Sequence, residues 1–394
     1  MFIKERHFPL SGKKWDANKA KSAMQEIAVD TLANLTSGYL WPTHPLDNNI
    51  AHHGFYFGTS GVSWAINNLK QAGAIDINFN LEPAITKQLK SCQETYPTMP
   101  HSQNASYLMG DIPILMMQYR LTQDNSLLNQ IHDKIILNNS QPTREFMWGT
   151  AGTMTALTHL QRWLPNDVRW NNAFRVQASR LLQELQKHEK YGYFWEHDVY
   201  GKKTHYLGPI HGNSGNSLSL IKGSQLIDDS DYELLCDKII VGALKTAITS
   251  SRHANWPAIA GQNQDMQLQH CHGAPGIINA LSELPKGIDS EFDKTLLKGG
   301  ELIWHAGPLL KGHGLCHGTA GNGFAFLKLF QRTNNEIWLN RARIFAMEGI
   351  AQYQQAKQRF NQGRYSLWNG DVGLALFINE CSKETAQFPT IDTF

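Results

Sequence analysis

The sequence predicts an all-α fold in which seven inner and seven outer helices form a double ring, an α/α-toroid. Two observations lead to this prediction: a glycine-containing word recurs seven times, and apolar residues spaced three or four apart follow and separate the copies. Period-two alternation bounded by hairpin turns, the mark of strands, is scarce. We expect one domain over residues 1–394, in which residues 1–50 form an N-terminal extension, a loop and an outer-helix region.

The recurring word has the form Gly-x-x-Gly, as in Gly149-Thr-Ala-Gly152 and Gly318-Thr-Ala-Gly321. The first glycines of its seven copies stand at positions 58, 110, 149, 212, 273, 318 and 370. The second copy, Gly110-Asp-Ile-Pro113, is degenerate. One such word alone is a weak signal, but seven copies along one chain predict a repeat architecture.

Each repeat reads as an outer helix, a loop, the glycine word and an inner helix. After Gly152, the residues Met154, Leu157 and Leu160 follow at helical spacing. The next segment carries one apolar stripe with polar residues elsewhere, which is typical of an outer amphipathic helix. The stripe consists of Trp170, Phe174, Ala178, Leu181 and Leu185.

Seven helix pairs can close into a ring, whereas an open solenoid needs polar caps at both ends. Glycines at the inner-helix starts allow close approach of the backbone, and the unpaired N–H groups there are expected to make these ends locally positive. In a closed ring all the glycine words face one end of the cavity, and the functional site is expected at that end.

Composition excludes several classes of function. Apolar residues make up 41% and charged residues 18% of the chain, which suits a globular protein. The formal net charge of +2 gives no electrostatic case for nucleic acid or an anionic membrane. The start of the chain lacks a signal-like apolar region, and no later stretch approaches the length of a membrane span. Five scattered cysteines favour a reducing compartment, so we expect a cytoplasmic protein.

The residue before the first glycine of each word takes an equivalent place around the ring. In chain order these residues are Phe57, Met109, Trp148, His211, His272, His317 and Asn369. Three consecutive repeats therefore present histidine, and the last two of these histidines follow Cys271 and Cys316.

Two thiolates and an imidazole that converge at a cavity mouth suit Zn²⁺, and three protein ligands leave a fourth position open, as in catalytic sites. The spacing leaves His272 and His317 as alternatives for the third ligand. A buried cysteine is otherwise a small hydrophobe, which is how we interpret Cys92, Cys236 and Cys381.

The words His211-Gly-Asn-Ser-Gly, Cys271-His-Gly-Ala-Pro-Gly and Lys311-Gly-His-Gly-Leu-Cys316-His-Gly-Thr-Ala-Gly resemble those of the lanthionine synthetase C-like proteins. The resemblance covers essentially the whole chain and implies an α/α-toroid with one Zn²⁺ per chain. The family includes lanthipeptide cyclases and stand-alone glutathione-binding relatives, and it adds thiols to dehydroalanine or dehydrobutyrine.

The resemblance implies that Cys271, Cys316 and His317 are the zinc ligands. It also implies that His211 acts as the acid or base and that Glu145, four residues before Gly149, orients or tunes it.

Two further residues resemble those of the stand-alone relatives. Lys311 matches a lysine five residues before the ligand cysteine and is expected to offset charge on the substrate, and Arg6 resembles part of an Arg-x-Phe-Pro motif that helps hold glutathione. The chain departs from the family at His270, where tryptophan is frequent, and at Gln267, where the cyclases have arginine. These departures affect substrate contacts and leave the roles of His270 and His272 open.

Three functions follow as hypotheses. The first is a zinc-dependent enzyme that joins glutathione or a peptide cysteine to a dehydroamino acid in a peptide or protein. The second is a lanthipeptide cyclase that closes thioether rings within one precursor. The third is a non-catalytic adaptor that binds glutathione or a protein. A glycoside hydrolase would need two carboxylates across the cavity, but the glycine words present cysteine and histidine. The sequence does not specify the natural substrate, the stereochemistry or the oligomeric state.

Overall fold

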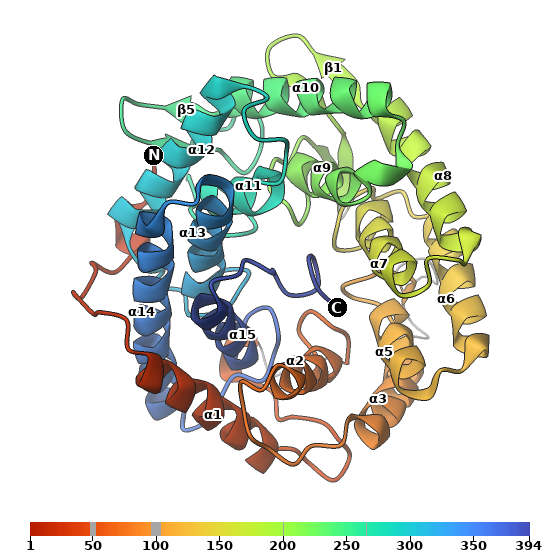
Figure 1. The fold of residues 1–394 in the computed structure, drawn as a ribbon, viewed down its shortest axis with the longest axis vertical. Helices are drawn as coiled ribbons and strands as arrows, with labels where there is room; N and C mark the ends of the chain where they lie inside the picture. The colour runs from red at the N-terminus through yellow and green to blue at the C-terminus, as the bar shows by residue number, and fades with distance from the viewer. Residues whose placement is uncertain (48–52, 96–103, 200, 265) are drawn as a thin grey trace.

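The computed structural model describes residues 1–47, 53–95, 104–199, 201–264 and 266–394. Within these ranges, fourteen α-helices form two concentric rings (Figure 1), so the predicted fold class is confirmed. No helix in these ranges combines the length and the apolar character needed to cross a bilayer.

The inner ring consists of the helices that follow the glycine words. Its members are α2 (Thr59–Gln71), α5 (Ile112–Thr122), α7 (Thr150–Trp163), α9 (Asn213–Lys222), α11 (Ala274–Leu281), α13 (Thr319–Thr333) and α15 (Asp371–Lys383). These helices are buried on nearly every side; all eight residues of α11, for example, are buried.

The outer ring consists of the helices between the words. Its members are α1 (Ala17–Ala33), α3 (Leu81–Thr95), α6 (Asn125–Asn138), α8 (Val168–Glu184), α10 (Asp229–Thr246), α12 (Ser290–Ala306) and α14 (Glu336–Phe360). Each packs one face inward: in α8, Trp170, Phe174 and Leu181 of the predicted stripe are fully buried. α1 lies within the region 1–50 and completes this ring (Figure 1).

The two rings start their helices differently. The outer helices α1, α6, α8, α12 and α14 begin at Asp or Asn side chains that accept a hydrogen bond from the first turn, such as Asp289, which accepts from Phe292 N at 2.8 Å. The inner helices that begin at Gly have no side-chain cap. At the starts of α9, α13 and α15 the first N–H groups donate instead to carbonyls of the preceding loop, as Thr319 does to Gly312 at 2.9 Å.

This pairing corrects one expectation from the sequence. The N–H groups of Asn213 and Ser214 bind the carbonyls of Tyr206 and Leu207, at 2.8 and 3.1 Å. The first donors of α9 and α13 are therefore used within the loops and are not unpaired groups for binding a substrate anion.

Glycine is needed in the words because each loop folds back against its own helix start. A β-carbon at Gly149 would clash with the carbonyl oxygen of Thr143, and one at Gly321 would clash with that of Leu315. Gly273 has in addition a φ of +99°, which side chains other than glycine rarely adopt.

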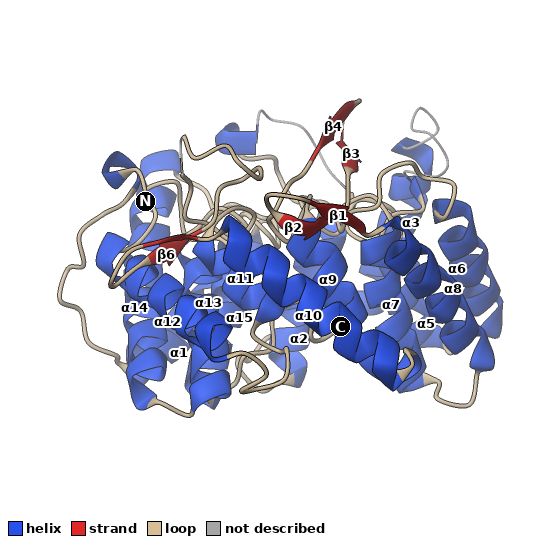
Figure 2. Cartoon of the chain, turned by 90° about the horizontal axis from the view of Figure 1, so that it is seen from above, coloured by secondary structure: helices blue, strands red, loops and turns tan. Residues whose placement is uncertain are grey.

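Three short antiparallel hairpins, which the sequence analysis did not predict, lie in the connections from outer to inner helices. β1 (Gln186–His188) pairs with β2 (Gly192–Phe194), and β3 (His197–Val199) pairs with β4 (Lys202–Thr204), before α9. β5 (Ile248–Thr249) pairs with β6 (Ala254–Asn255) before α11. Figure 2 shows these strands at one face of the double ring, where the inner helices begin.

The segment after α15 runs into the middle of the inner ring (Figure 1). Phe394 packs against Phe55, Trp64 and Tyr107, and the Thr390 carbonyl accepts a hydrogen bond from the Tyr107 hydroxyl at 2.7 Å. The C-terminal segment of the chain therefore lies in the middle of the inner ring and packs against the first two repeats.

Candidate metal centre

Cys271, Cys316 and His317 come together where α11 and α13 begin. One ligand atom from each lies within 4.8 Å of the other two, and both cysteines are buried while His317 is half-buried. Cys271 stands two residues before Gly273, the N-cap of α11, and Cys316 stands two residues before Gly318, the N-cap of α13. The equivalent places of the two words in neighbouring repeats bring the sulfurs together, and the Cys271 N–H donates to the Cys316 carbonyl at 3.4 Å.

The donor set and its spacing fit Zn²⁺. Atoms that share a tetrahedral zinc at bond lengths of about 2.0–2.3 Å lie roughly 3.5–4 Å apart. Cys316 Sγ and His317 Nε2 are separated by 3.7 Å. His317 Nδ1 donates to Asn369 Oδ1 at 3.3 Å, which fixes the ring with Nε2 toward the sulfur, as the outer partners of ligand histidines do.

The geometry selects one of the two candidate histidines. Among the described residues, the group able to hold an ion contains His317 and not His272. The His272 ring lies 6.4 Å from that of Tyr206, and its Nδ1 makes no hydrogen bond within the described chain. Burial lowers the pKa of His272 to about 4.

The pKa values of the two thiols shift in opposite directions. Burial and the neighbouring Cys316 raise the pKa of Cys271 well above its ordinary value. Burial would raise the pKa of Cys316 as well, but the hydrogen bond from Cys271 and the charge of His317 outweigh it and hold this pKa well below its ordinary value. Of the two thiols, Cys316 is therefore the one that loses its proton more readily, and thiolate is the form that binds zinc.

Glu145 and His211 form a pair in the neighbouring repeats. His211 Nδ1 lies 2.6 Å from Glu145 Oε2, and Glu145 also accepts hydrogen bonds from the N–H groups of Met147 and Trp148. Glu145 thus orients the histidine and holds its own loop at the same time. Burial opposes the charged imidazole, but the hydrogen bond and charge of Glu145, with a contribution from Cys316, raise the pKa of His211.

Lys311 and Arg6 lie at the rim of the same end of the ring, and both are exposed. The N-terminal segment pairs with the loop before α13: the Leu310 N–H donates to the Arg6 carbonyl at 2.9 Å. This brings Arg6 beside Lys311 along the backbone. Burial dominates the raised pKa of Cys271, and the positive charge of Lys311 partly opposes it, so the lysine lies within electrostatic reach of the cluster.

Sequence reasoning missed two residues that contact the sulfurs. Gln269 Nε2 donates to Cys271 Sγ at 3.0 Å. The buried Tyr56 hydroxyl hydrogen-bonds the Cys316 side chain; burial first, and then the nearby sulfurs, raise its pKa. A signal for Tyr56 was present, because it stands two residues before Gly58, in the same register as Cys271 and Cys316. Gln269 has no such signal.

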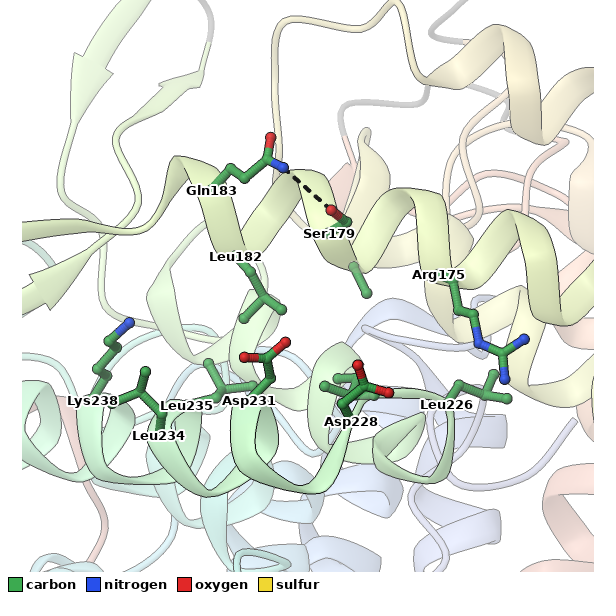
Figure 3. A pocket seen from close by; sticks show the side chains of 12 residues that line it. Arg175, Ser179, Leu182, Gln183, Leu226, Asp228, Asp231, Leu234, Leu235 and Lys238 are labelled. Atoms are coloured by element: carbon green, nitrogen blue, oxygen red, sulfur yellow. Dashed lines mark hydrogen bonds between the residues drawn. The ribbon is translucent and has the colours of Figure 1, made fainter.

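A hollow lies on the outside of the toroid. A pocket of about 460 Å³ runs between α8, which contributes Arg175 and Leu182, and α10, which contributes Asp231 and Leu235 (Figure 3). No residue of the cysteine–histidine cluster lines it. The remaining cysteines, Cys92, Cys236 and Cys381, are buried, as core residues are.

A helical toroid with a buried pair of thiols and a histidine at one end defines a class of protein, and comparisons with known proteins show the same class. The lanthionine synthetase C-like protein model matches residues 120–393. This chain belongs to that family, which confirms the resemblance seen in the sequence, including the similarity to stand-alone relatives.

The individual proteins that match this chain share only a small part of its sequence. Glutathione S-transferase LANCL1 of Danio rerio is 23% identical over 322 residues, which cover 78% of this chain and 77% of the relative. LanC-like protein GCL1 of Arabidopsis thaliana is 31% identical over 142 residues, which cover 34% of this chain and 32% of the relative. The structure of nisin cyclase matches with a TM-score of 0.60 at 14% identity, over 93% of this chain and 95% of that one, and shows the shared fold.

Proposed function

We propose that this protein is a zinc-dependent enzyme that adds the thiol of glutathione, or of a peptide cysteine, to dehydroalanine or dehydrobutyrine in a peptide or protein. Membership of the family indicates thioether-forming or glutathione-related chemistry in general. The observation that carries the finer proposal is the convergence of Cys271, Cys316 and His317 within 4.8 Å. The name of the Danio rerio relative supports glutathione as the thiol.

The cluster would hold one Zn²⁺ through two sulfurs and one nitrogen. When bound there, the ion would lower the pKa of an incoming thiol and so favour its nucleophilic thiolate form. Gln269 and Asn369 hold Cys271 and His317 in place by hydrogen bonds of 3.0 and 3.3 Å. Five cysteines scattered along the chain fit a reducing compartment, and we propose the cytoplasm.

His211 moves the proton in this mechanism. The thiolate sulfur bonds to the β-carbon of the dehydroamino acid, the π electrons shift to the carbonyl as an enolate, and the α-carbon then takes up a proton. The net change transfers the thiol proton to carbon, so no oxidant or reductant is required. Glu145 keeps His211 oriented and raises its pKa, which keeps the ring able to carry that proton near neutral pH.

Lys311 and Arg6 are proposed to bind anionic groups. At the rim beside the cluster, Lys311 can offset the enolate charge or a glutathione carboxylate. Arg6 lies beside it through the pairing of its backbone with Leu310.

The test mixes the purified protein with glutathione and a dehydroalanine peptide and measures the adduct by mass spectrometry. We expect an adduct with the wild type and with Cys236→Ala, a matched control that removes a buried thiol from outer helix α10. We expect none above background with Cys316→Ala. Equal adduct from Cys316→Ala would overturn the proposal.

A peptide that carries both cysteine and dehydroalanine distinguishes the cyclase alternative, because ring closure leaves its mass unchanged. Zinc and glutathione binding without either product would indicate an adaptor.

A further inference from the structure

A cavity of about 420 Å³ opens beside the metal cluster. It lies between the loop before α13, the C-terminal half of α14 and the loop before α15. One of its lining residues contacts the cluster, because Asn369 accepts the hydrogen bond from His317. The cavity therefore borders the cluster on the side of His317.

Part of the lining is apolar and exposed. Phe8, Leu46 and Leu310 are 40%, 54% and 52% exposed, and all three line this cavity. They come from three segments that are distant in the sequence, so the fold gathers them here. Exposed apolar residues gathered at a concave, polar-rimmed site mark a binding surface. Glutathione has no large apolar side chain to cover them.

The charged part of the lining has an excess of cations. Among the described residues, Asp371 is the one carboxylate that lines the cavity, and it is already bound by His313 at 2.7 Å and by the N–H of Arg364 at 2.8 Å. Two of the four lining cations have acidic partners elsewhere: Lys357 lies 3.1 Å from Asp30, and Arg364 pairs with Asp47.

The other two cations, Lys311 and Arg359, have no carboxylate within 4.0 Å in the described part of the chain. The Arg359 guanidinium lies 5.2 Å from the centre of the Phe360 ring, beside an apolar side chain of the same lining. This end of the cavity thus combines an uncompensated positive charge with apolar surface.

We propose that this cavity binds the segment of the acceptor peptide that flanks the dehydroamino acid, and that it selects segments with acidic and apolar side chains. The proposal rests on the proposed function and names the substrate class of that reaction. Arg359 receives a carboxylate of the peptide, Phe8, Leu46 and Leu310 cover its apolar side chains, and Lys311 lies at the end nearest the cluster.

The test uses short peptides that share one apolar sequence and differ only in flanking residues, which are Glu, Gln or Lys. Each is made with dehydroalanine for turnover and with alanine for binding, and binding is read by fluorescence anisotropy. We expect the wild type to bind the Glu peptide about fivefold more tightly than the Gln peptide, since one charge pair at a partly exposed site contributes about this much. Arg359→Gln should abolish this preference, and Arg359→Glu should reverse it in favour of the Lys peptide.

Arg175→Glu is the matched control, because it makes the same charge change on exposed outer helix α8, away from the cluster. It should leave the preference as in the wild type, and the KM for glutathione should be unchanged in Arg359→Glu. Identical peptide preferences in the wild type and Arg359→Glu would overturn the proposal, even if adducts form. If no adduct forms but the alanine peptides show the expected preference, the reaction is wrong and the binding site stands.

Discussion

The Tyr56 and Trp368 rings stack with their centroids 5.2 Å apart and their planes 14° from parallel. The backbone N–H of Trp368 also donates to the Tyr56 carbonyl at 3.2 Å. These residues belong to the first and the last repeat, and α15 packs against α2 behind them. The ring is therefore closed. Closure matters for the site, because the Trp368 carbonyl accepts hydrogen bonds from the backbone N–H groups of Leu315 and Cys316, at 2.8 and 2.9 Å. The last repeat thus holds the loop of a cluster cysteine.

Glu145→Gln tests the positioning role of Glu145. The change removes the charge that raises the pKa of His211, while the burial that lowers this pKa remains. We expect the limb of the pH–rate profile that reports His211 to move to lower pH, and kcat to fall by roughly 10²-fold, within the usual range for general acid–base catalysis. Metal content, measured in parallel, should not change. A pH–rate profile identical to that of the wild type would show that Glu145 only holds its loop.

Gly273→Ala tests the loop that carries Cys271. The added methyl group must adopt a φ of +99° and would clash with the Gln267 carbonyl, so the loop has to shift. We expect a loss of about 2–3 kcal/mol in the free energy of unfolding, together with reduced zinc content. Gly287→Ala is the matched control: its φ is also positive, at +72°, but the new atom meets nothing within 4 Å. It should cost about 1 kcal/mol and retain the metal. Equal effects of the two changes would contradict the clash.

Two buried histidines predict sensitivity to acid. Burial lowers the pKa of both His159 and His197 to about 3. Above pH 6.5 these rings are neutral in the folded and unfolded states. Below pH 6.5 the rings bind protons in the unfolded state, but in the folded state they bind them only near pH 3. The free energy of unfolding therefore falls by up to about 1.4 kcal/mol per pH unit for each ring.

His197→Leu should make this loss with falling pH less steep, as measured by urea unfolding from pH 8 to pH 4. His197 makes no hydrogen bond within the described chain, so the change removes two unsatisfied buried nitrogens. The difference between variant and wild type should be constant near pH 8, which serves as an internal control, and should grow below pH 6.5. Parallel curves throughout would contradict the lowered pKa of His197.

Asp392→Asn tests the ion cluster that fixes the C-terminal segment. Asp392 contacts both Lys222 and Lys328, the latter at 2.7 Å, and the two cations outweigh burial and hold its pKa low. Loss of the charge leaves Lys328 buried with Glu283 as its remaining acidic partner. We expect a loss of about 3 kcal/mol in the free energy of unfolding, measured with urea. Glu283→Gln, at a half-exposed carboxylate, should cost less than half as much; equal losses would place the stabilisation elsewhere.

The sequence was sufficient to predict those features that repeat in register. The glycine words located the inner helices, because each marks a place where a loop approaches its own helix start too closely for a side chain. The same register placed Cys271 and Cys316 together. It could not choose His317 over His272, because that choice depends on Asn369, which fixes the orientation of His317.

Other features depend on tertiary contacts that have no periodic signal. Phe388 stacks on His270 with the ring centroids 4.5 Å apart, next to Cys271, although it belongs to the segment inside the ring. The contact of Gln269 with Cys271 arises from a local bridge between Gln269 and His272. The hairpins before α9 and α11 are too short, at two or three residues per strand, to produce an alternating pattern.

The central claim is that Cys271, Cys316 and His317 bind a single zinc ion and leave one position for the thiol. Zinc K-edge X-ray absorption of the purified protein tests it most directly. We predict one zinc per chain with two sulfur neighbours at about 2.3 Å and nitrogen or oxygen neighbours at about 2.0–2.1 Å, one of which is replaced by sulfur when glutathione is added. A protein with intact cysteines and no zinc, or a zinc ion without sulfur neighbours, would contradict the account.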